Sequence, residues 1–179
     1  MPRVPKVPKV RLWHPATHVR RLVTRQSFTR LLRIRKNGSM PYQFFDHTGD
    51  IGVRLSGRSL EELFTSAAMA FSDTVTSLAG VEPRRPEELD VAAPELDLLM
   101  VDFLSELLYR FDTRGWLTRD AQVEIREQDG GWELQGTLIG ERHDPARHPV
   151  KILIKAVTYH GLQVEQRDGV WGARVVFDI

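Results

Sequence analysis

The sequence predicts an α+β fold, in which a mostly antiparallel β-sheet packs against two α-helices. Short runs of alternating apolar and polar residues, separated by turn-forming residues, are typical of antiparallel strands and hairpins. Two longer segments instead repeat apolar residues every three or four positions, as amphipathic helices do. The composition, with 41% hydrophobic and 27% charged residues among 179, is that of an ordinary globular protein.

Two short strands and a helix are expected first. Tyr42 to Asp46 forms an aromatic strand, and apolar residues alternate with others from Ile51 to Leu55, which predicts a half-buried strand. Ser59 with Glu62 three residues later is a capping box, so a helix is expected to begin there and to end at Gly80.

The middle of the chain is expected to contain a loop, a short strand and the second helix. The loop covers Glu82–Glu88, which includes two prolines, and the strand covers Leu89–Ala93. The second helix is expected to open at Pro94 and to end before Gly115. Its wide apolar stripe predicts that it is largely buried against a sheet.

The last third is predicted to consist of strands. Asp129-Gly130-Gly131 marks one hairpin turn, and Asp168-Gly169 marks another between the last two strands. A polar stretch, Gly140–Pro149, interrupts the strands before the alternation resumes at Ile152–Ala156. The final strand runs to Ile179.

The charge is distributed unevenly along the chain. Residues 1–39 contain eleven Lys and Arg and no Asp or Glu, which leaves 14 basic and 24 acidic residues in 40–179. The basic segment is interpreted as an extension of a folded domain 40–179, or as a misplaced start before Met40; a transit peptide or a nucleic-acid-binding arm are alternatives. Because the acidic domain repels phosphates, it is expected to bind a cation or a basic protein rather than nucleic acid.

Several classes of protein are excluded or disfavoured. The absence of cysteine excludes disulfides, a cysteine zinc site, an iron–sulfur cluster and a thiol nucleophile. No run approaches 18 apolar residues, so no membrane partner is expected. Without a phosphate-binding loop, a nucleophile elbow or a histidine pair at helical spacing, nothing in the sequence requires an enzyme active site.

The first candidate site is Asp46-His47-Thr48-Gly49-Asp50, which places two carboxylates and an imidazole between two apolar strands. The competing interpretation is an ordinary turn, because Asp, Thr and Gly all favour one.

The second candidate site is the end of the sequence. In Phe177-Asp178-Ile179 a side-chain carboxylate lies next to the terminal one, and hard cations such as calcium and magnesium prefer charged oxygens. The competing interpretation is a frayed, solvated end. It is weakened by the apolar residues Val175–Phe177, which are expected to dock the strand.

Two further groups are weaker candidates. Gly140–Asp144 with His148 superficially resembles a metal cluster, but Arg142 and Arg147 would compete for the carboxylates, so a polar surface loop is expected. Lys155 and the polar residues after it could face a partner or solvent.

Five segments together resemble the archease family, in order over about 140 residues from Met40 onward. They are Phe44–Ile51, Gly57–Glu62, Gly140-Glu141, Lys155–His160 and Asp178-Ile179. The resemblance implies the same α+β fold.

It also implies a function, that of an accessory protein and not an enzyme. Archeases act in the cytoplasm on the GTP-dependent RNA-splicing ligase, which joins 2′,3′-cyclic-phosphate or 3′-phosphate ends to 5′-hydroxyl ends in tRNA splicing and RNA repair. They promote guanylylation of the active-site histidine of the ligase and thereby multiple turnover.

The family resemblance implies a divalent cation as cofactor, calcium first, with magnesium or manganese as alternatives. Its ligands would be Asp50, Asp178 and the main-chain carboxylate of Ile179. The residues expected to support this site or face the partner are Asp46, His47, Glu141 and Lys155. Such a site requires the first strand-turn and the last strand to be neighbours in one sheet.

Three other functions remain open at this point. The main alternative is a chaperone-like modulator of RNA-modifying proteins. A metal-dependent hydrolase would use Asp46, His47 and Asp50, but no further base or nucleophile is evident. An RNA-binding module would use the basic segment.

Overall fold

The structure is a computed structural model and describes residues 41–47 and 49–179; the expected extension 1–39 lies outside them. The described elements are, in chain order, β1 (Tyr42–His47), β2 (Asp50–Gly57), α2 (Leu60–Val75), the short 3₁₀ helix η1 (Leu78–Gly80), β3 (Arg85–Ala93), α3 (Leu96–Arg114), β4 (Trp116–Gln128), β5 (Gly131–Arg142), β6 (Ala156–Arg167) and β7 (Val170–Asp178).

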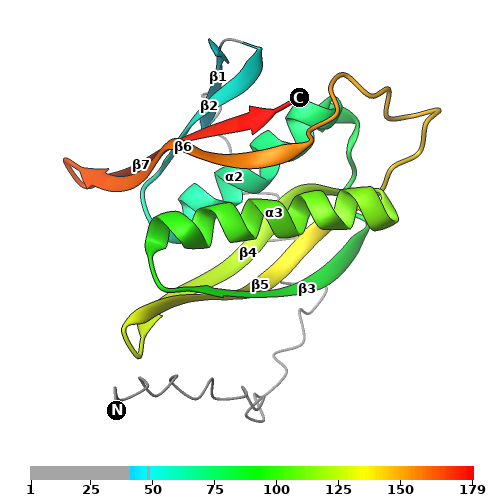
Figure 1. The fold of residues 1–179 in the computed structure, drawn as a ribbon. Coiled ribbons are helices and arrows are strands. Elements are labelled where there is room, and N and C mark those ends of the chain that lie inside the picture. Colours follow the sequence, from blue (N-terminus) through cyan, green and yellow to red (C-terminus); the bar gives the residue numbers. More distant parts are fainter. Residues whose placement is uncertain (1–40, 48) are drawn as a thin grey trace, which may run out of the picture. The chain divides into compact units, whose positions relative to one another are not determined.

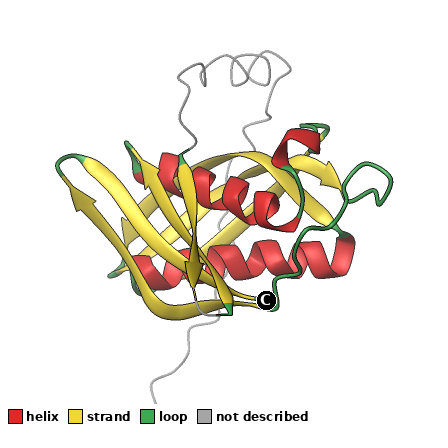
Figure 2. Ribbon diagram, turned by 90° about the horizontal axis from the view of Figure 1, so that it is seen from above, coloured by secondary structure: helices red, strands yellow, loops and turns green. Residues whose placement is uncertain are grey.

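The strands form two antiparallel sheets, of order β1-β2-β7-β6 and β3-β5-β4. Helices α2 and α3 contact strands of both sheets and lie between them (Figures 1 and 2). The predicted α+β class is therefore confirmed, with the strands divided between two sheets. One face of each sheet is turned away from the helices.

Only one of the two hydrogen bonds of the predicted capping box forms at the start of α2. The Ser59 hydroxyl accepts a hydrogen bond from the Glu62 N–H at 3.3 Å. The Glu62 carboxylate accepts from the Arg58 N–H at 2.9 Å, rather than from that of Ser59. Both bonds satisfy N–H groups at the start of the helix.

The helix ends at Val75 rather than at Gly80. The Asp73 carboxylate accepts a hydrogen bond from the Leu78 N–H at 3.0 Å, which turns the chain into η1. The end of α3 agrees with the prediction, because Gly115 takes the left-handed conformation (φ +67°) and donates its N–H to the Phe111 carbonyl at 2.7 Å.

Aromatic side chains join the layers at their centre. The rings of Phe64 on α2 and Phe103 on α3 meet edge to face at 5.4 Å between centroids. The rings of Phe71 on α2 and Phe177 on β7 meet in the same way at 6.1 Å. All four side chains are fully buried, so the end of β7 is anchored in the core.

Three further local predictions are wrong. The expected loop Glu82–Glu88 becomes strand at Arg85, and Pro86 is tolerated because β3 is an edge strand of its sheet. Pro94 lies before the N-cap residue Glu95 and therefore outside α3. The alternation at Ile152–Ala156 does not mark a strand before Ala156; Ile154 is buried because it packs in the core.

The four-stranded sheet has two different faces. On the face toward the helices, Val53 and Leu55 of β2 lie beside Val175 and Ala173 of β7, all buried. On the other face, Arg54 of β2 lies directly opposite Arg174 of β7, and both are exposed. This alternation decides which functional side chains share a face.

Candidate functional site

The two candidate segments meet in the four-stranded sheet. Strands β2 and β7 pair with Ile51 opposite Phe177. Asp50 precedes Ile51 and Asp178 follows Phe177, so their backbones lie at adjacent ends of neighbouring strands. The expected neighbourhood of the first strand-turn and the last strand is thus found. We call Asp50, Asp178, Ile179 and Lys155 the carboxylate corner.

Lys155 ties the end of β7 in place. Its backbone N–H donates to the Asp178 carbonyl at 2.8 Å, and its Nζ donates to the main-chain oxygen of Ile179 at 2.7 Å. Together with the buried Phe177 ring, these bonds dock the end of the chain, so the frayed-end interpretation does not describe this structure. The ammonium group also neutralises part of the charge that gathers at the corner.

The backbone register places Asp46 of the first motif on a different face of the sheet from Asp50. His47 pairs with Asp50 across the β1–β2 turn, whereas Asp46 pairs with Ile51 and belongs to the opposite face. Gly49 in this turn has φ +78°, a conformation that favours glycine. Asp46 therefore does not share a face with Asp50.

Asp46 lines a cavity of about 330 Å³ at the end of α2, together with Asp73 and Lys151. Asp73 accepts hydrogen bonds from the Tyr42 hydroxyl at 3.0 Å and from Lys151 Nζ at 3.1 Å. Burial acts to raise the pKa of Asp73, but the hydrogen bonds from Leu78 N–H, Lys151 and Tyr42 outweigh it, so the pKa is lowered.

Glu141 lies in the three-stranded sheet, with its side chain 5% exposed, and so has little surface to offer a partner. Its carboxylate accepts two hydrogen bonds from Arg147, at 2.7 and 2.9 Å, and one from the Glu82 N–H at 2.6 Å. Burial acts to raise its pKa, but Arg147, the Glu82 N–H and Arg84 prevail and lower the pKa to about 2.

His148 is completely buried beside Glu141. Its Nδ1 accepts from the Asp144 N–H at 2.9 Å, and its Nε2 lies 3.2 Å from the Gly80 carbonyl. The polar surface loop expected for Gly140–Asp144 with His148 is therefore correct only in part. Gly140–Arg142 end strand β5 and a loop follows, but Glu141 and His148 are buried in an ionic network rather than exposed to solvent.

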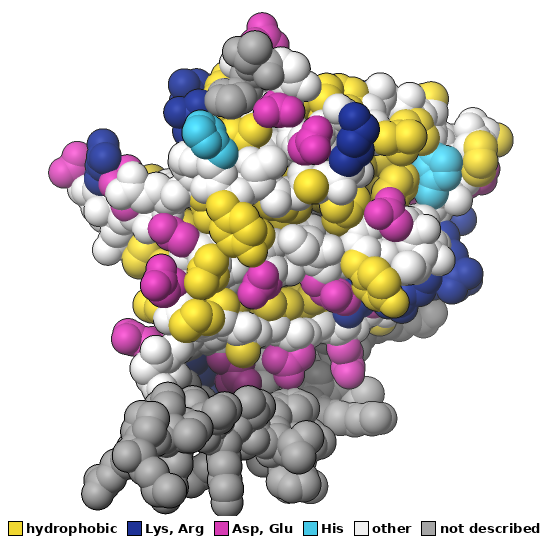
Figure 3. Space-filling model, viewed as in Figure 1, with side chains coloured by type: hydrophobic (Ala, Val, Ile, Leu, Met, Phe, Trp, Pro, Cys, Tyr) yellow, Lys and Arg dark blue, Asp and Glu magenta, His cyan; other side chains and the backbone are white. Residues whose placement is uncertain are grey.

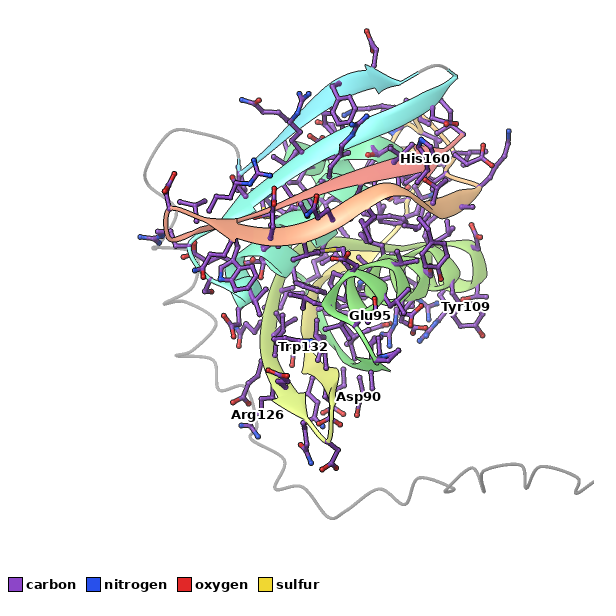
Figure 4. All side chains as sticks on the ribbon, turned by 60° about the vertical axis from the view of Figure 1, so that its left-hand side comes forward. Asp90, Glu95, Tyr109, Arg126, Trp132 and His160 are labelled. Atoms are coloured by element: carbon purple, nitrogen blue, oxygen red, sulfur yellow. The ribbon has the colours of Figure 1, made fainter. Side chains whose placement is uncertain are left out.

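The polar residues after Lys155 follow the edge strand β6. The Thr158 hydroxyl donates to the Val176 carbonyl at 3.1 Å, and the register then shifts before Gln163. The Tyr159 side chain is 61% exposed beside this irregularity, and His160 follows it (Figure 4).

The corner suits a hard cation by its donor chemistry. Asp50, Asp178 and a carboxylate at Ile179 supply only oxygen, as calcium, magnesium and manganese prefer. Over residues 41–47 and 49–179, no group of three His, Asp or Glu side chains is spaced to hold a metal.

Sequence reasoning missed two features of the described residues. One is the cavity with Asp73 and Lys151, and the other is the Arg54–Arg174 pair on the outer face. Each joins residues far apart in the chain, so no local spacing could reveal them.

The fold and the corner together define a class: a small α+β domain of two antiparallel sheets, with carboxylates where β2 and β7 meet. The model of the archease protein family matches residues 42–179. The chain belongs to the archease family.

Relatives that the match covers almost completely carry the name "Protein archease". That of Pyrococcus furiosus is 37% identical over 139 residues, which cover 77% of this chain and 98% of the relative. That of Methanopyrus kandleri is 37% identical over 140 residues, with 78% and 100% covered. The solution structure of a Methanobacterium thermoautotrophicum protein matches with TM-score 0.70 and 33% identity, covering 79% of this chain and all of that one.

Membership of the archease family supports an accessory role beside partner proteins. Within the part of the chain that the structure describes, neither helix is long and apolar enough to cross a membrane.

Proposed function

We propose that this protein is a cytoplasmic accessory factor of the GTP-dependent RNA-splicing ligase in tRNA splicing and RNA repair. It promotes guanylylation of the ligase and thereby allows repeated turnover. The observation that carries the proposal is the meeting of Asp50 with Asp178 at the end of the sheet, in a member of the archease family. Asp178 ends the docked strand β7 and Asp50 begins its neighbour β2, so each lies on strand backbone.

The carboxylate corner would hold a divalent cation, with calcium the first choice and magnesium or manganese as alternatives. The ligands are Asp50, Asp178 and the main-chain carboxylate of Ile179. When bound, the cation supplies positive charge that can pair with phosphate oxygens of GTP at the ligase active site. Lys155 positions the end of the chain through its two hydrogen bonds and offsets the surplus of negative charge.

The test is ligation by the cognate ligase under multiple turnover with GTP and a divalent cation. Wild type is compared with Asp50→Asn and Asp178→Asn, which keep the size of each side chain and remove its charge. Asp102→Asn, on an exposed position of α3, is the matched control. We expect repeated ligation with wild type and control only. Full activity of both corner variants contradicts the metal-site proposal.

A calorimetric titration with Ca²⁺ separates the site from the partner. We expect binding to wild type and the Asp102→Asn control, and a loss of affinity of at least about tenfold in Asp50→Asn, because removing one charged ligand weakens a hard-cation site. Extension of the chain beyond Ile179 by a short neutral tag converts the carboxylate into an amide, and we expect the same loss.

The second candidate is a chaperone-like modulator of RNA-modifying proteins, favoured by exposed apolar side chains near the corner. Leu153 is 62% and Tyr159 61% exposed. Under this alternative, Leu153→Ser abolishes the stimulation of a client protein while Asp178→Asn leaves it intact. The ligase proposal predicts that Asp178→Asn is the more damaging change.

A further inference from the structure

The outer face of the four-stranded sheet carries a row of long polar side chains across all four strands. Gln43 of β1 pairs with Arg54 of β2, Arg54 with Arg174 of β7, and Arg174 with Gln163 of β6. All four residues are exposed. Because directly paired residues share a face, the row presents two guanidinium groups flanked by two amides. Figure 4 shows this sheet seen obliquely, with side chains projecting from the face away from the helices.

An aromatic ring holds both guanidinium groups. Arg54 Cζ lies 4.5 Å and Arg174 Cζ 4.8 Å from the centroid of the Phe45 ring. The ring reaches across β2 over Gly52, where an added Cβ would lie 2.1 Å from the Phe45 Cζ. Glycine at this position therefore makes room for the ring. The cation–π contacts orient two flexible side chains before any ligand arrives.

Among the described residues, Arg54 and Arg174 have no carboxylate partner, unlike Arg58, Arg110, Arg147 and Arg167. Like charges directly opposite each other on neighbouring strands destabilise a sheet. Within residues 41–47 and 49–179, the ion pairs to carboxylates involve other arginines, including Arg167 with Glu165 at 2.8 Å on the same sheet. Two exposed, oriented and unneutralised guanidinium groups side by side form a site for an anion.

We propose that this row binds the phosphate backbone of single-stranded RNA. At about 4.8 Å between strands, the row extends over about 14 Å, enough for consecutive phosphates of an extended strand. Guanidinium groups bind phosphate in bidentate fashion, and their planes stack on unpaired bases. The amides of Gln43 and Gln163 can both donate to and accept from a 2′-hydroxyl. The choice of RNA over DNA rests on the proposed function.

The acidity of the domain does not oppose this site, because most acidic residues lie outside this sheet. Asp50 and Asp178 share the face of the row, but each lies four residues along its strand from Arg54 or Arg174, at the end of the sheet. Residues 85–142, which contain β3, α3, β4 and β5, hold 14 acidic and 6 basic residues. Figure 3 shows acidic side chains spread over the face that carries α3 and β3. Strands β1, β2, β6 and β7 together hold four acidic and three basic residues, so their net charge is close to zero. The sequence-based expectation against nucleic acid used the average charge of the domain.

The test is binding of a fluorescent uridine oligonucleotide of about ten residues to the full chain, with no ligase present. Fluorescence anisotropy between about 50 and 200 mM KCl gives affinity and salt dependence. The variant is Arg54→Gln/Arg174→Gln. The matched control, Arg126→Gln/Arg167→Gln, removes two exposed arginines that are already paired with Glu124 and Glu165. Photo-cross-linking and mass spectrometry locate the bound RNA in each protein.

For the variant, we expect cross-links to β1, β2 and β7 to disappear, and the slope of log K against log salt to fall by about 1.4, because each single-strand phosphate contact contributes about 0.7. The affinity of the variant for the oligonucleotide falls at least tenfold, while the control keeps its salt slope and its cross-links. Thermal unfolding of the variant should match wild type or exceed it, since a like-charge pair is removed. Cross-links confined to residues 1–39 in wild type, or an unchanged slope in the variant, overturn the proposal.

If the double variant unfolds at a lower temperature than wild type, the single variant Arg174→Gln replaces it, because this variant leaves Arg54 on the Phe45 ring. The expected fall in the salt slope is then about 0.7. Because the assay contains no ligase, its failure leaves the ligase proposal standing. Conversely, loss of ligase activation with intact RNA binding leaves the RNA proposal standing.

Discussion

Replacement of Glu141 by glutamine should destabilise the protein in a pH-dependent way. The carboxylate is almost fully buried and bonded to Arg147 and to the Glu82 N–H, and its pKa is lowered from 4.5 to about 2. A pKa lowered in the folded state contributes stability above the unfolded value, and this contribution disappears as the pH falls from 4.5 through 2. A depression of this size corresponds to about 3 kcal/mol.

The assay is urea unfolding of wild type and Glu141→Gln at several values from pH 7 to pH 2. We expect the variant to be less stable by about 3 kcal/mol at pH 7, within the range for breaking a buried ion pair. The difference should shrink between pH 4.5 and pH 2, where the wild-type carboxylate becomes protonated. Comparison with Glu124→Gln, an exposed residue, controls for the other carboxylates. A difference that stays constant over this range refutes the reasoning.

Three other changes test the packing around the carboxylate corner, the arginine row and the cavity beside Asp73. Phe177→Ala removes a buried ring that packs on Phe71, so unfolding free energy should fall by about 3–5 kcal/mol and Ca²⁺ binding should weaken; an unchanged urea midpoint contradicts this. Gly52→Ala forces the Phe45 ring aside, and we expect a loss of about 1–3 kcal/mol together with weaker RNA binding, both absent if the ring moves freely. Tyr42→Phe deletes the bond to Asp73 and should cost about 1 kcal/mol in thermal unfolding; no change means that the bond contributes nothing.

The parts of the fold that could be predicted are those with local causes. The Ser59 cap, the left-handed Gly115 and the turns at Asp129-Gly130 and Asp168-Gly169 all appear as expected, and the turn residues have positive φ. Each of these depends on the conformational preference of one or two residues. The sequence contains that information within a few positions.

The features that could not be predicted depend on pairing between distant segments. Glu141 and His148 look like surface residues by type, but they are buried because Arg147, Gly80 and Glu82 satisfy them. Charged residues are rarely buried without such partners, and the partners are invisible until the loop is folded.

The neighbourhood of the two carboxylate-bearing segments was predicted, whereas their role as metal ligands stays a prediction. The meeting of Asp50 and Asp178 was required by the family resemblance, and the pairing of β2 with β7 provides it. The position of Asp46 could not be known, because a residue on the other side of a turn changes face with the exact register. The arginine row on the outer face depends on three such registers at once.

The central claim is that the carboxylate corner activates the ligase, and the most direct measurement is guanylylation of the ligase histidine in a single turnover with labelled GTP. The reactions contain the ligase with wild type, Asp178→Asn or the Asp102→Asn control, each with and without a divalent cation. We predict faster formation of the labelled ligase with wild type and control, only when the cation is present. Equal stimulation by Asp178→Asn, or no stimulation by wild type, would contradict the account.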